Sequence, residues 1–292
     1  MSKYYVFAKE FIAPKLEKGL YIVATPIGNL KDISIRALEV LASADLIICE
    51  DTRTSAKLLN HYGIKTKRLA FHEHNEREKT NSIIKRLETG QSVALISDAG
   101  TPLINDPGFV LVRSARERGL NIFSLPGACA LIAALSIAGL PSDNFSFHGF
   151  LPPKAGTRKN ALEKLKNNSE TLIFYESPRR LSKTIDAIKD IFGEQTEVAI
   201  ALEISKKFER VMRGSLLELS EALSDKQIKG EAVILVSGAK EIELDENIWK
   251  SELKNALRDK TLKSSVDEIT TKFNLKRKKV YDEALKIKQE KG

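Results

Sequence analysis

Short runs of apolar, β-branched residues alternate with stretches of helical spacing through the first half of the chain. Apolar runs of about four to eight residues predict buried strands, and apolar residues three or four apart predict one-sided helices. Strands are expected at 20–24, 46–49, 68–71, 93–97 and 122–125, and helices at 34–44, 55–61, 76–88, 108–118 and 128–138. Strands that alternate with helices are typical of an α/β domain with a largely parallel sheet.

A second α/β unit is predicted after Gly139 and Pro141, which end the preceding helix. Its strands are expected at 145–149, 171–175, 198–202, 209–214 and 232–237, and its helices at 158–167, 178–191 and 216–223. The third and fourth of these strands are close enough in sequence to form an antiparallel pair. This sheet is therefore expected to be mixed.

The segment from Asp245 to the C-terminus contains helix formers and no strand pattern. Helical spacing at 264–272 and 276–288, with a short joint between them, predicts a helix-turn-helix. Its core is expected to contain Val266, Ile269, Phe273, Val280, Ala284 and Ile287. The second helix then begins with a basic quartet, which is Lys276, Arg277, Lys278 and Lys279. In this motif the second helix enters a nucleic-acid groove, although a solvated basic face is the alternative.

These patterns divide the chain into four parts. They are an N-terminal extension at 1–18, two α/β domains at 19–139 and 142–240, and a basic helical module at 247–292. The fold class is therefore α/β, with a small helical domain added at the C-terminal end.

Charge and composition narrow the class of protein further. Lys and Arg number 47 against 39 Asp and Glu, and the net charge of +8 favours a polyanionic partner. Cys49 and Cys129 lie inside apolar runs without zinc-ligand spacing, so we expect buried, reduced thiols and no metal site. The longest near-apolar stretch, 128–140, is shorter than the ~20 residues that span a membrane. The N-terminus lacks the pattern of a signal peptide, and we expect a cytoplasmic protein.

Three loops rich in small residues follow predicted strands, where ligands bind in open α/β sheets. They are TPIGNL at 25–30, SDAGTPLINDPG at 97–108 and PGACA at 126–130. In the first loop, Pro26 fixes φ and Gly28 lacks a Cβ atom, so the backbone can approach a ligand closely. None of the three loops has the glycine spacing of loops that bind dinucleotides or nucleoside triphosphates. In the second loop Asp98 offers an acceptor for a ribose or a cation, whereas Asp106 is interpreted as the cap of the helix that Pro107 starts.

Together these loops resemble those of the tetrapyrrole methylase superfamily of S-adenosylmethionine-dependent enzymes. The closer resemblance is to its bacterial 16S ribosomal RNA cytidine-2′-O-methyltransferase branch. Further matching segments are CEDTR at 49–53, FHEHNE at 71–76, FYESPRRL at 174–181 and GEAV at 230–233. The resemblance implies a cofactor cleft between the two α/β domains and a cytidine in 16S rRNA of the 30S subunit as substrate. It also implies a homodimer, to which Phe145, Phe147 and Phe150 could contribute.

The resemblance also assigns cofactor-binding residues, position by position. They are Pro26, Gly28, Asp98, Ala99, Gly100, Thr101, Pro102, Leu103, Cys129, Ala130, Tyr175, Glu176 and Ala232. Cys129 would then be a small packing residue, because methyl transfer from a sulfonium needs no covalent enzyme intermediate.

The remaining candidate residues would either assist removal of the proton from the acceptor hydroxyl or bind the phosphates of the RNA. A ribose hydroxyl is a weak acid, so a base or a cation beside it would accelerate transfer. The candidates are Glu50, Asp51, His74, Glu203 and Lys206. Lys206 could lose its proton if it is desolvated beside another cation, although a solvated turn is the alternative.

Arg53, Arg179 and Arg180 are predicted to contact phosphate. The last two begin a helix, where a cation opposes the helix dipole. Arg53 could instead be neutralised by the neighbouring carboxylates of Glu50 and Asp51.

Two other functions remain open at this point. A methyltransferase that acts on a small tetrapyrrole would share the cofactor cleft. A non-catalytic RNA-binding or ribosome-assembly factor could retain the cleft without using it.

Overall fold

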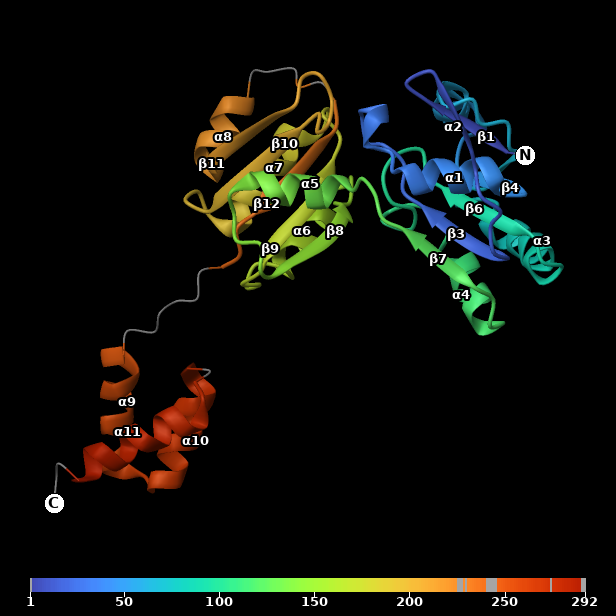
Figure 1. Cartoon of the computed structure of the whole chain (residues 1–292). Coiled ribbons are helices and arrows are strands. Elements are labelled where there is room, and N and C mark those ends of the chain that lie inside the picture. The colour runs from blue at the N-terminus through green and yellow to red at the C-terminus, as the bar shows by residue number, and fades with distance from the viewer. Residues whose placement is uncertain (1, 225–227, 229, 240–245, 274, 290–292) are drawn as a thin grey trace. The chain divides into compact units, whose positions relative to one another are not determined.

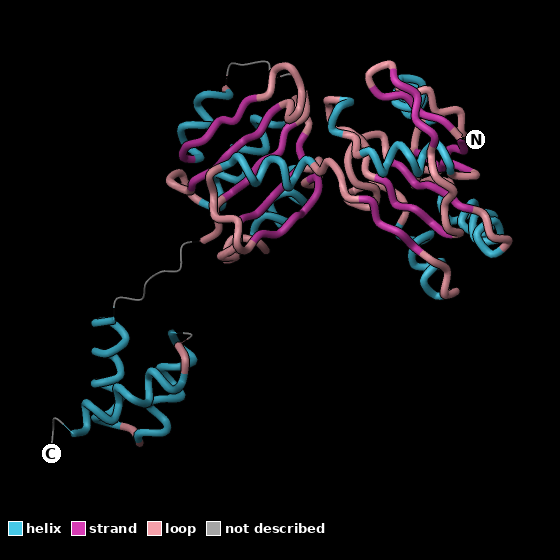
Figure 2. Tube along the Cα trace, viewed as in Figure 1, coloured by secondary structure: helices cyan, strands magenta, loops and turns pink. Residues whose placement is uncertain are grey.

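The structure is a computed structural model that describes residues 2–224, 228, 230–239, 246–273 and 275–289 (Figure 1). The chain forms two compact units, Met1–Gly238 and Ala239–Gly292. In the first unit two sheets follow each other along the chain, each with its own helices (Figure 2). No helix among the described residues is long and apolar enough to cross a membrane.

The first sheet is parallel throughout, with the strand order β5-β4-β6-β3-β7. Its strands are β3 (Gly19–Val23), β4 (Leu46–Cys49), β5 (Arg68–Ala70), β6 (Ser92–Ile96) and β7 (Ile122–Leu125). The helices α1 (Ile35–Ser43) and α2 (Thr52–His61) pack on one face. The helices α3 (Glu76–Glu88) and α4 (Phe109–Glu117) pack on the other. The central strands are therefore buried on both faces, as continuous apolar runs predict for a parallel sheet.

The second sheet is mixed, as predicted, with the strand order β11-β10-β12-β9-β8. Its strands are β8 (Phe145–Phe150), β9 (Thr171–Glu176), β10 (Glu197–Leu202), β11 (Arg210–Ser215) and β12 (Ala232–Val236). Only β8 and β9 pair in parallel; the other pairs, including β10 with β11, are antiparallel. The helices α6 (Ala155–Glu163), α7 (Leu181–Phe192) and α8 (Leu216–Leu223) contribute to the core on one face.

The other face of the second sheet is covered by helix α5 (Ala130–Ala138), although this helix follows the last strand of the first sheet (Figure 1). Leu131, Leu135 and their small neighbours pack on the sheet. Ile132 and Ile137 are 50% and 45% exposed, so the helix is buried on one side only. Helix α5 therefore connects the two halves of the first unit through the packing of its buried side.

The N-terminal extension forms an antiparallel hairpin of β1 (Lys3–Val6) and β2 (Lys9–Ile12), which was not predicted. Tyr4 is buried and stacks on Phe11. The backbone nitrogen of Tyr5 donates a hydrogen bond of 2.9 Å to the carbonyl of Tyr62. The extension is therefore fastened to the first α/β half by packing and a backbone hydrogen bond.

The second unit contains α9 (Glu246–Asp259), α10 (Leu262–Phe273) and α11 (Arg277–Gln289). The last two confirm the predicted helix pair, while Asn274 of the predicted joint lies outside the described residues. The predicted apolar core also forms, but α9 adds Trp249 and Leu253 to it. Helix α9 was not among the predicted helices, although Trp249, Leu253 and Leu257 follow helical spacing.

The buried contact of α9 gives the first testable expectation. Replacing Leu253, which is fully buried, with alanine should cost about 2–5 kcal/mol in the free energy of unfolding of this unit. The chain has one tryptophan, so urea unfolding followed by Trp249 fluorescence reports this unit selectively. Ile248→Ala on the exposed side of α9 is the matched control and should change the midpoint little. Equal shifts for both variants would contradict the assigned packing.

Candidate active site

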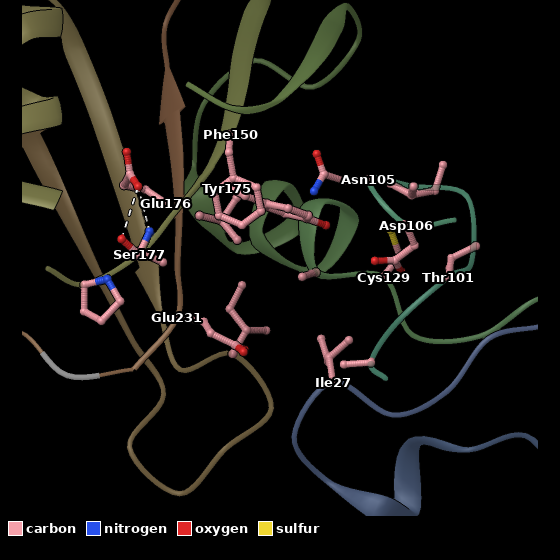
Figure 3. Close-up of a pocket in the computed structure, with 17 residues that line it drawn as sticks. Ile27, Thr101, Asn105, Asp106, Cys129, Phe150, Tyr175, Glu176, Ser177 and Glu231 are labelled. Atoms are coloured by element: carbon pink, nitrogen blue, oxygen red, sulfur yellow. Dashed lines mark hydrogen bonds between the residues drawn. The ribbon is translucent and has the colours of Figure 1, made fainter. Parts of the chain in front are cut away.

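The two α/β halves of the first unit line a cavity of about 310 Å³ (Figure 3). Three segments of the first half and the start of α5 contribute Ile27, Ala99, Thr101, Ile104, Asn105, Asp106, Cys129 and Ala130. The second half contributes Phe150, Tyr175, Glu176, Ser177, Pro178, Ile204, Glu231, Ala232 and Val233. The cavity therefore lies where the loops after the strands of both sheets meet.

Seven of the thirteen residues predicted to bind a cofactor line this cavity. They are Ala99, Thr101, Cys129, Ala130, Tyr175, Glu176 and Ala232. The other six, Pro26, Gly28, Asp98, Gly100, Pro102 and Leu103, lie in the same loops but outside the lining.

Several of these six hold the loops in place. Thr25 and Gly100 exchange two backbone hydrogen bonds of 2.8 and 2.9 Å, which joins the first two loops. A Cβ atom at Gly28 would lie 2.5 Å from the side chain of Lys206, so glycine allows close approach of the loop from the second half. Gly28 and Gly100 thus position the loops that form the cavity without lining it themselves.

Backbone strain is concentrated around the cavity. Leu103 and Asn105 in the loop after β6 have positive φ angles of 73° and 66°. Glu203 and Ser205 in the loop after β10 have φ angles of 52° and 63°. Each such residue costs roughly 1–3 kcal/mol and persists only where the surrounding structure fixes it. Away from the turn of the N-terminal hairpin, they are the non-glycine residues with positive φ in the described part of the chain.

The interpretation of Asp106 as a helix cap is wrong. Helix α4 has Gly108 as its N-cap without a side-chain hydrogen bond. The carboxylate of Glu76 takes that role from another helix, because its Oε1 accepts the backbone N–H groups of Gly108 and Val110 at 3.0 Å each. Asp106 is free of the capping role, and its side chain lines the cavity beside Cys129 (Figure 3).

The environment of Asp106 is unusual for a carboxyl group. Its pKa is raised to about 6, mainly by burial; a hydrogen bond from Ser97 acts in the opposite direction, while the nearby carboxylates of Glu50 and Asp98 also act to raise it. In the part of the chain that the structure describes, no lysine, arginine or histidine forms an ion pair with Asp106. Asp106 is thus an unpaired acid in a partly desolvated site.

Glu176 is buried and fully engaged by its own half of the unit. Its carboxylate accepts hydrogen bonds from the Ser177 backbone at 2.8 Å and the Thr184 hydroxyl at 2.7 Å. Arg180 lies 3.2 Å from the same carboxylate and donates to the carbonyl of Leu151 at 2.6 Å. The predicted phosphate contact of Arg180 does not fit this geometry, because its guanidinium neutralises a buried acid.

Tyr175 lies at the carboxyl end of β9, next to Phe150 (Figure 3). Its hydroxyl oxygen accepts a hydrogen bond of 3.3 Å from the backbone of Leu131 at the start of α5. Burial raises the pKa of Tyr175 to about 12, so the phenol stays neutral at physiological pH. Phe150, which was considered for a dimer contact, lines the cavity instead.

The five candidate bases lie outside the cavity lining. Asp51 caps α2 and forms a two-pronged ion pair with Arg53, at 3.2 and 2.8 Å, which lowers its pKa to about 2. This arrangement corresponds to self-neutralisation, the alternative that the sequence left open. The Arg53 side chain is 90% exposed. His74 lies near His72, with ring centres 6.0 Å apart, and Glu50 lies behind the cavity lining.

Lys206 lacks the neighbouring cation that would lower its pKa and leave its amine neutral. Its ammonium lies 2.8 Å from Glu203 and 3.1 Å from Glu231. Burial lowers its pKa, but the hydrogen bonds to these two carboxylates outweigh that effect and the pKa lies above its usual value. The prediction that Lys206 loses its proton beside another cation is wrong, because its neighbours are anions.

Three lining residues carry carboxylates, namely Asp106, Glu176 and Glu231, and most others are apolar or small. No lysine, arginine or histidine belongs to the described lining. Such a surface favours a ligand that is neutral or positively charged over one that carries phosphates. Groups of three or more His, Cys, Asp or Glu placed to hold a metal ion are not found among the residues described.

Asn105, Ile204 and Glu231 are among the lining residues that were not predicted. Glu231 precedes β12, and β12 runs antiparallel to β9 with Ala232 opposite Glu176. The start of an antiparallel strand therefore lies beside the end of its neighbour. The rule that ligands bind at carboxyl ends of strands finds sites in parallel sheets, but it does not point to such a residue.

The second unit presents the basic quartet at the start of α11. Arg277 forms an ion pair of 2.7 Å with Asp267, and Lys279 lies over the ring of Trp249 at 5.6 Å. Lys276 and Lys278 are exposed. All four residues are exposed, but Arg277 and Lys279 each contact another residue of the module.

Comparisons with known proteins identify the family to which the chain belongs. A family model described as Tetrapyrrole (Corrin/Porphyrin) Methylases matches residues 19–220. A protein of Pseudomonas aeruginosa named Ribosomal RNA small subunit methyltransferase I is 51% identical over 80% of this chain and 84% of its own. A protein of the same name from Vibrio cholerae is 51% identical over 75% of this chain and 77% of its own.

Solved structures show the same architecture. One is uroporphyrin-III C-methyl transferase from Thermus thermophilus in complex with S-adenyl homocysteine, with a TM-score of 0.53 and 16% identity. The match covers 75% of this chain and 97% of that chain. At this identity the similarity supports the fold alone. The family match over residues 19–220 and the relatives at 51% identity show that the chain belongs to the tetrapyrrole (corrin/porphyrin) methylase family.

Proposed function

We propose that this protein transfers a methyl group from S-adenosylmethionine to the ribose 2′-hydroxyl of a cytidine in 16S rRNA of the small ribosomal subunit. The observation that carries the proposal is the cavity between the two α/β halves, which is apolar and acidic and has no cationic side chain in its described lining. A sulfonium cofactor suits such a surface. The names of the relatives at 51% identity support ribosomal RNA as the substrate.

The residues present fit the cofactor. Small side chains at Ala99, Ala130 and Ala232 leave room for it, and no cationic side chain in the described lining opposes its positive charge. When bound, S-adenosylmethionine supplies a methyl group that is already activated by the sulfonium. The protein then has to bind and orient the two reactants and exclude water, which can supply a large part of the rate enhancement.

Cys129 and Tyr175 have no role as nucleophiles in this proposal. Tyr175 remains a neutral phenol because burial raises its pKa to about 12. Cys129 lines the cavity at the start of α5, where a larger residue would reduce its volume. Both side chains therefore act by shape and by hydrogen bonding.

The RNA backbone must be held outside the cavity, because the acidic lining repels phosphate. Arg179 is exposed next to the engaged Arg180, and Lys276 and Lys278 are exposed on the helical module. We assign phosphate contacts to these three residues. The net charge of +8 supports the attraction of a polyanion by the whole chain.

A homodimer and a cytoplasmic location are part of the same proposal. Phe145 is 38% exposed on β8, which is an edge strand of the second sheet. An exposed aromatic residue on a sheet edge is compatible with a contact between subunits.

The activity itself is the first test. The chain should transfer labelled methyl from S-adenosylmethionine to 30S subunits, and nucleoside digestion should locate the label in 2′-O-methylcytidine. Deproteinised 16S RNA and a tetrapyrrole precursor serve as parallel acceptors. Label in the tetrapyrrole alone would favour a small-molecule methyltransferase. Failure to bind S-adenosylmethionine would favour a non-catalytic RNA-binding factor.

The position of the cofactor is tested by Ala99→Leu. Ala99 is exposed at the cavity, so the larger side chain enters the cavity without overpacking a core. Calorimetric titration should show an affinity for S-adenosylmethionine reduced by about 10-fold or more, because a loss of ~1.4 kcal/mol in binding free energy lowers the affinity tenfold. Ala155→Leu, at an exposed position on α6, is the control and should bind as the unsubstituted chain does. Unchanged affinity in Ala99→Leu would place the cofactor elsewhere.

The role of the basic quartet is tested by reversing two of its charges. Lys276→Glu with Lys278→Glu should weaken binding of 30S subunits. It should also reduce the slope of log K against log salt concentration by about 1.4 to 1.8, as expected when two phosphate contacts are lost. Lys263→Glu with Lys288→Glu changes the net charge equally at other exposed positions of the module. Equal losses in both double variants would indicate a general charge effect without a specific contact.

A further inference from the structure

We propose that Asp106 accepts the proton of the ribose 2′-hydroxyl during methyl transfer. This inference rests on the function proposed above and names a residue that the sequence pattern assigned to a helix cap. It depends on three properties of the site, which are the fixed position of the carboxyl group, the engagement of the other carboxylates, and the absence of a cationic partner for Asp106 in the described chain.

The position of Asp106 is fixed by its neighbours along the loop. The loop begins at the backbone bridge between Thr25 and Gly100 and ends where Glu76 holds the N–H groups of Gly108 and Val110. Between these two points the backbone adopts strained left-handed conformations, including the residue directly before Asp106. A carboxyl group held by such a loop has a defined place relative to a bound substrate.

Asn105 contributes to the same rigidity. Gly149 has a φ angle of 60°, and a Cβ atom there would lie 2.5 Å from Oδ1 of Asn105. The glycine thus leaves space for the amide against the second half of the unit. The loop that carries Asp106 is consequently fitted to both halves.

The other carboxylates of the lining are already engaged. Glu176 accepts two hydrogen bonds and an arginine, so its protonation would break a buried network. The Glu231 side chain is 80% exposed and pairs with Lys206. Asp106 is the carboxylate of the described lining for which no ion pair is found, and it faces the cavity (Figure 3).

The charged groups around Asp106 make it a stronger base than an ordinary aspartate. Glu50 and Asp98 approach from the ends of the neighbouring strands, and both act to raise its pKa, while the Ser97 hydroxyl acts against them. Across the cavity, the Tyr175 phenol is neutral because burial raises its pKa to about 12, and Glu176 and Glu231 are paired with Arg180 and Lys206. A pKa of about 6 leaves most of the carboxylate ionised at neutral pH and brings its proton affinity closer to that of an effective general base.

Proton transfer and methyl transfer need no reactant besides the ribose hydroxyl, the cofactor and Asp106. The O–H bond of the ribose 2′-hydroxyl breaks, and its proton passes to a carboxylate oxygen of Asp106. The electron pair of the 2′-oxygen forms the new bond to the methyl carbon, and the carbon–sulfur bond breaks with its electron pair left on sulfur. Asp106 then releases its proton to water.

The test compares the unsubstituted chain with Asp106→Asn, which keeps the shape and removes the base. Single-turnover transfer to 30S subunits is measured between pH 5 and 9. With Asp106, the rate should rise through an inflection near pH 6 and then level. With asparagine, it should be lower by about 100-fold or more and lack that inflection. Glu117→Gln on α4 removes an exposed carboxylate as the matched control and should leave the rate unchanged.

Two readouts without turnover separate this role from others. Affinities for S-adenosylmethionine and for the neutral S-adenosylhomocysteine should both stay within about threefold in Asp106→Asn. A loss that affects only the cationic cofactor would make Asp106 a counter-ion and overturn the inference. The melting temperature of Asp106→Asn should exceed that of the unsubstituted chain at pH 7.5, because an unpaired buried charge has been removed.

This difference in melting temperature should shrink as the pH falls through 6, where Asp106 becomes protonated and no longer carries the buried charge. A lower melting temperature of the variant at pH 7.5 would indicate a structural role and overturn the inference. Absence of transfer by the unsubstituted chain would overturn the proposed function and the inference with it. Equal transfer by both chains would overturn the inference alone.

Discussion

The carboxylate of Glu76 makes the contact on which the geometry of the site depends. It lies on α3 and accepts the first N–H groups of α4, so it joins two helices that are distant in sequence. Because Glu76 satisfies these donors, the loop after β6 does not have to supply its own cap. The side chain of Asp106 is left for the cavity, and the strained conformations of Leu103 and Asn105 are held at both ends of the loop.

The chain separates two electrostatic tasks between different surfaces. The cavity of the first unit has carboxylates and no cationic side chain in its described lining, which suits a positively charged cofactor. Exposed lysines at the start of α11 offer the opposite charge on the second unit. One surface that carried out both tasks would neutralise itself, as Asp51 and Arg53 do at the start of α2. The proposed reaction needs both a sulfonium and a polyanion, and the chain keeps their binding surfaces chemically distinct.

Helix α5 determines how the halves of the first unit meet at the cavity. Its first residues line the cavity, and its buried side packs on the second sheet, although it follows β7 of the first sheet. The hydrogen bond from Leu131 to the hydroxyl of Tyr175 ties the start of this helix to β9. Small residues at Cys129 and Ala130 are therefore required both by the packing of the helix start and by the space left for a ligand.

The sequence by itself determined most of the elements of the two α/β halves, the parallel first sheet, the mixed second sheet, the family and several of the loops that form the cavity. These features depend on local periodicity and on short motifs, which are visible without long-range contacts. The roles of single polar side chains were decided only by the tertiary structure. Asp106 and Arg180 each had a plausible local role in the sequence, but Glu76 caps the helix in place of Asp106, and the buried Glu176 and the carbonyl of Leu151 engage Arg180. A cap, an ion pair or a desolvated acid is defined by its partners in space, and those partners are set by packing.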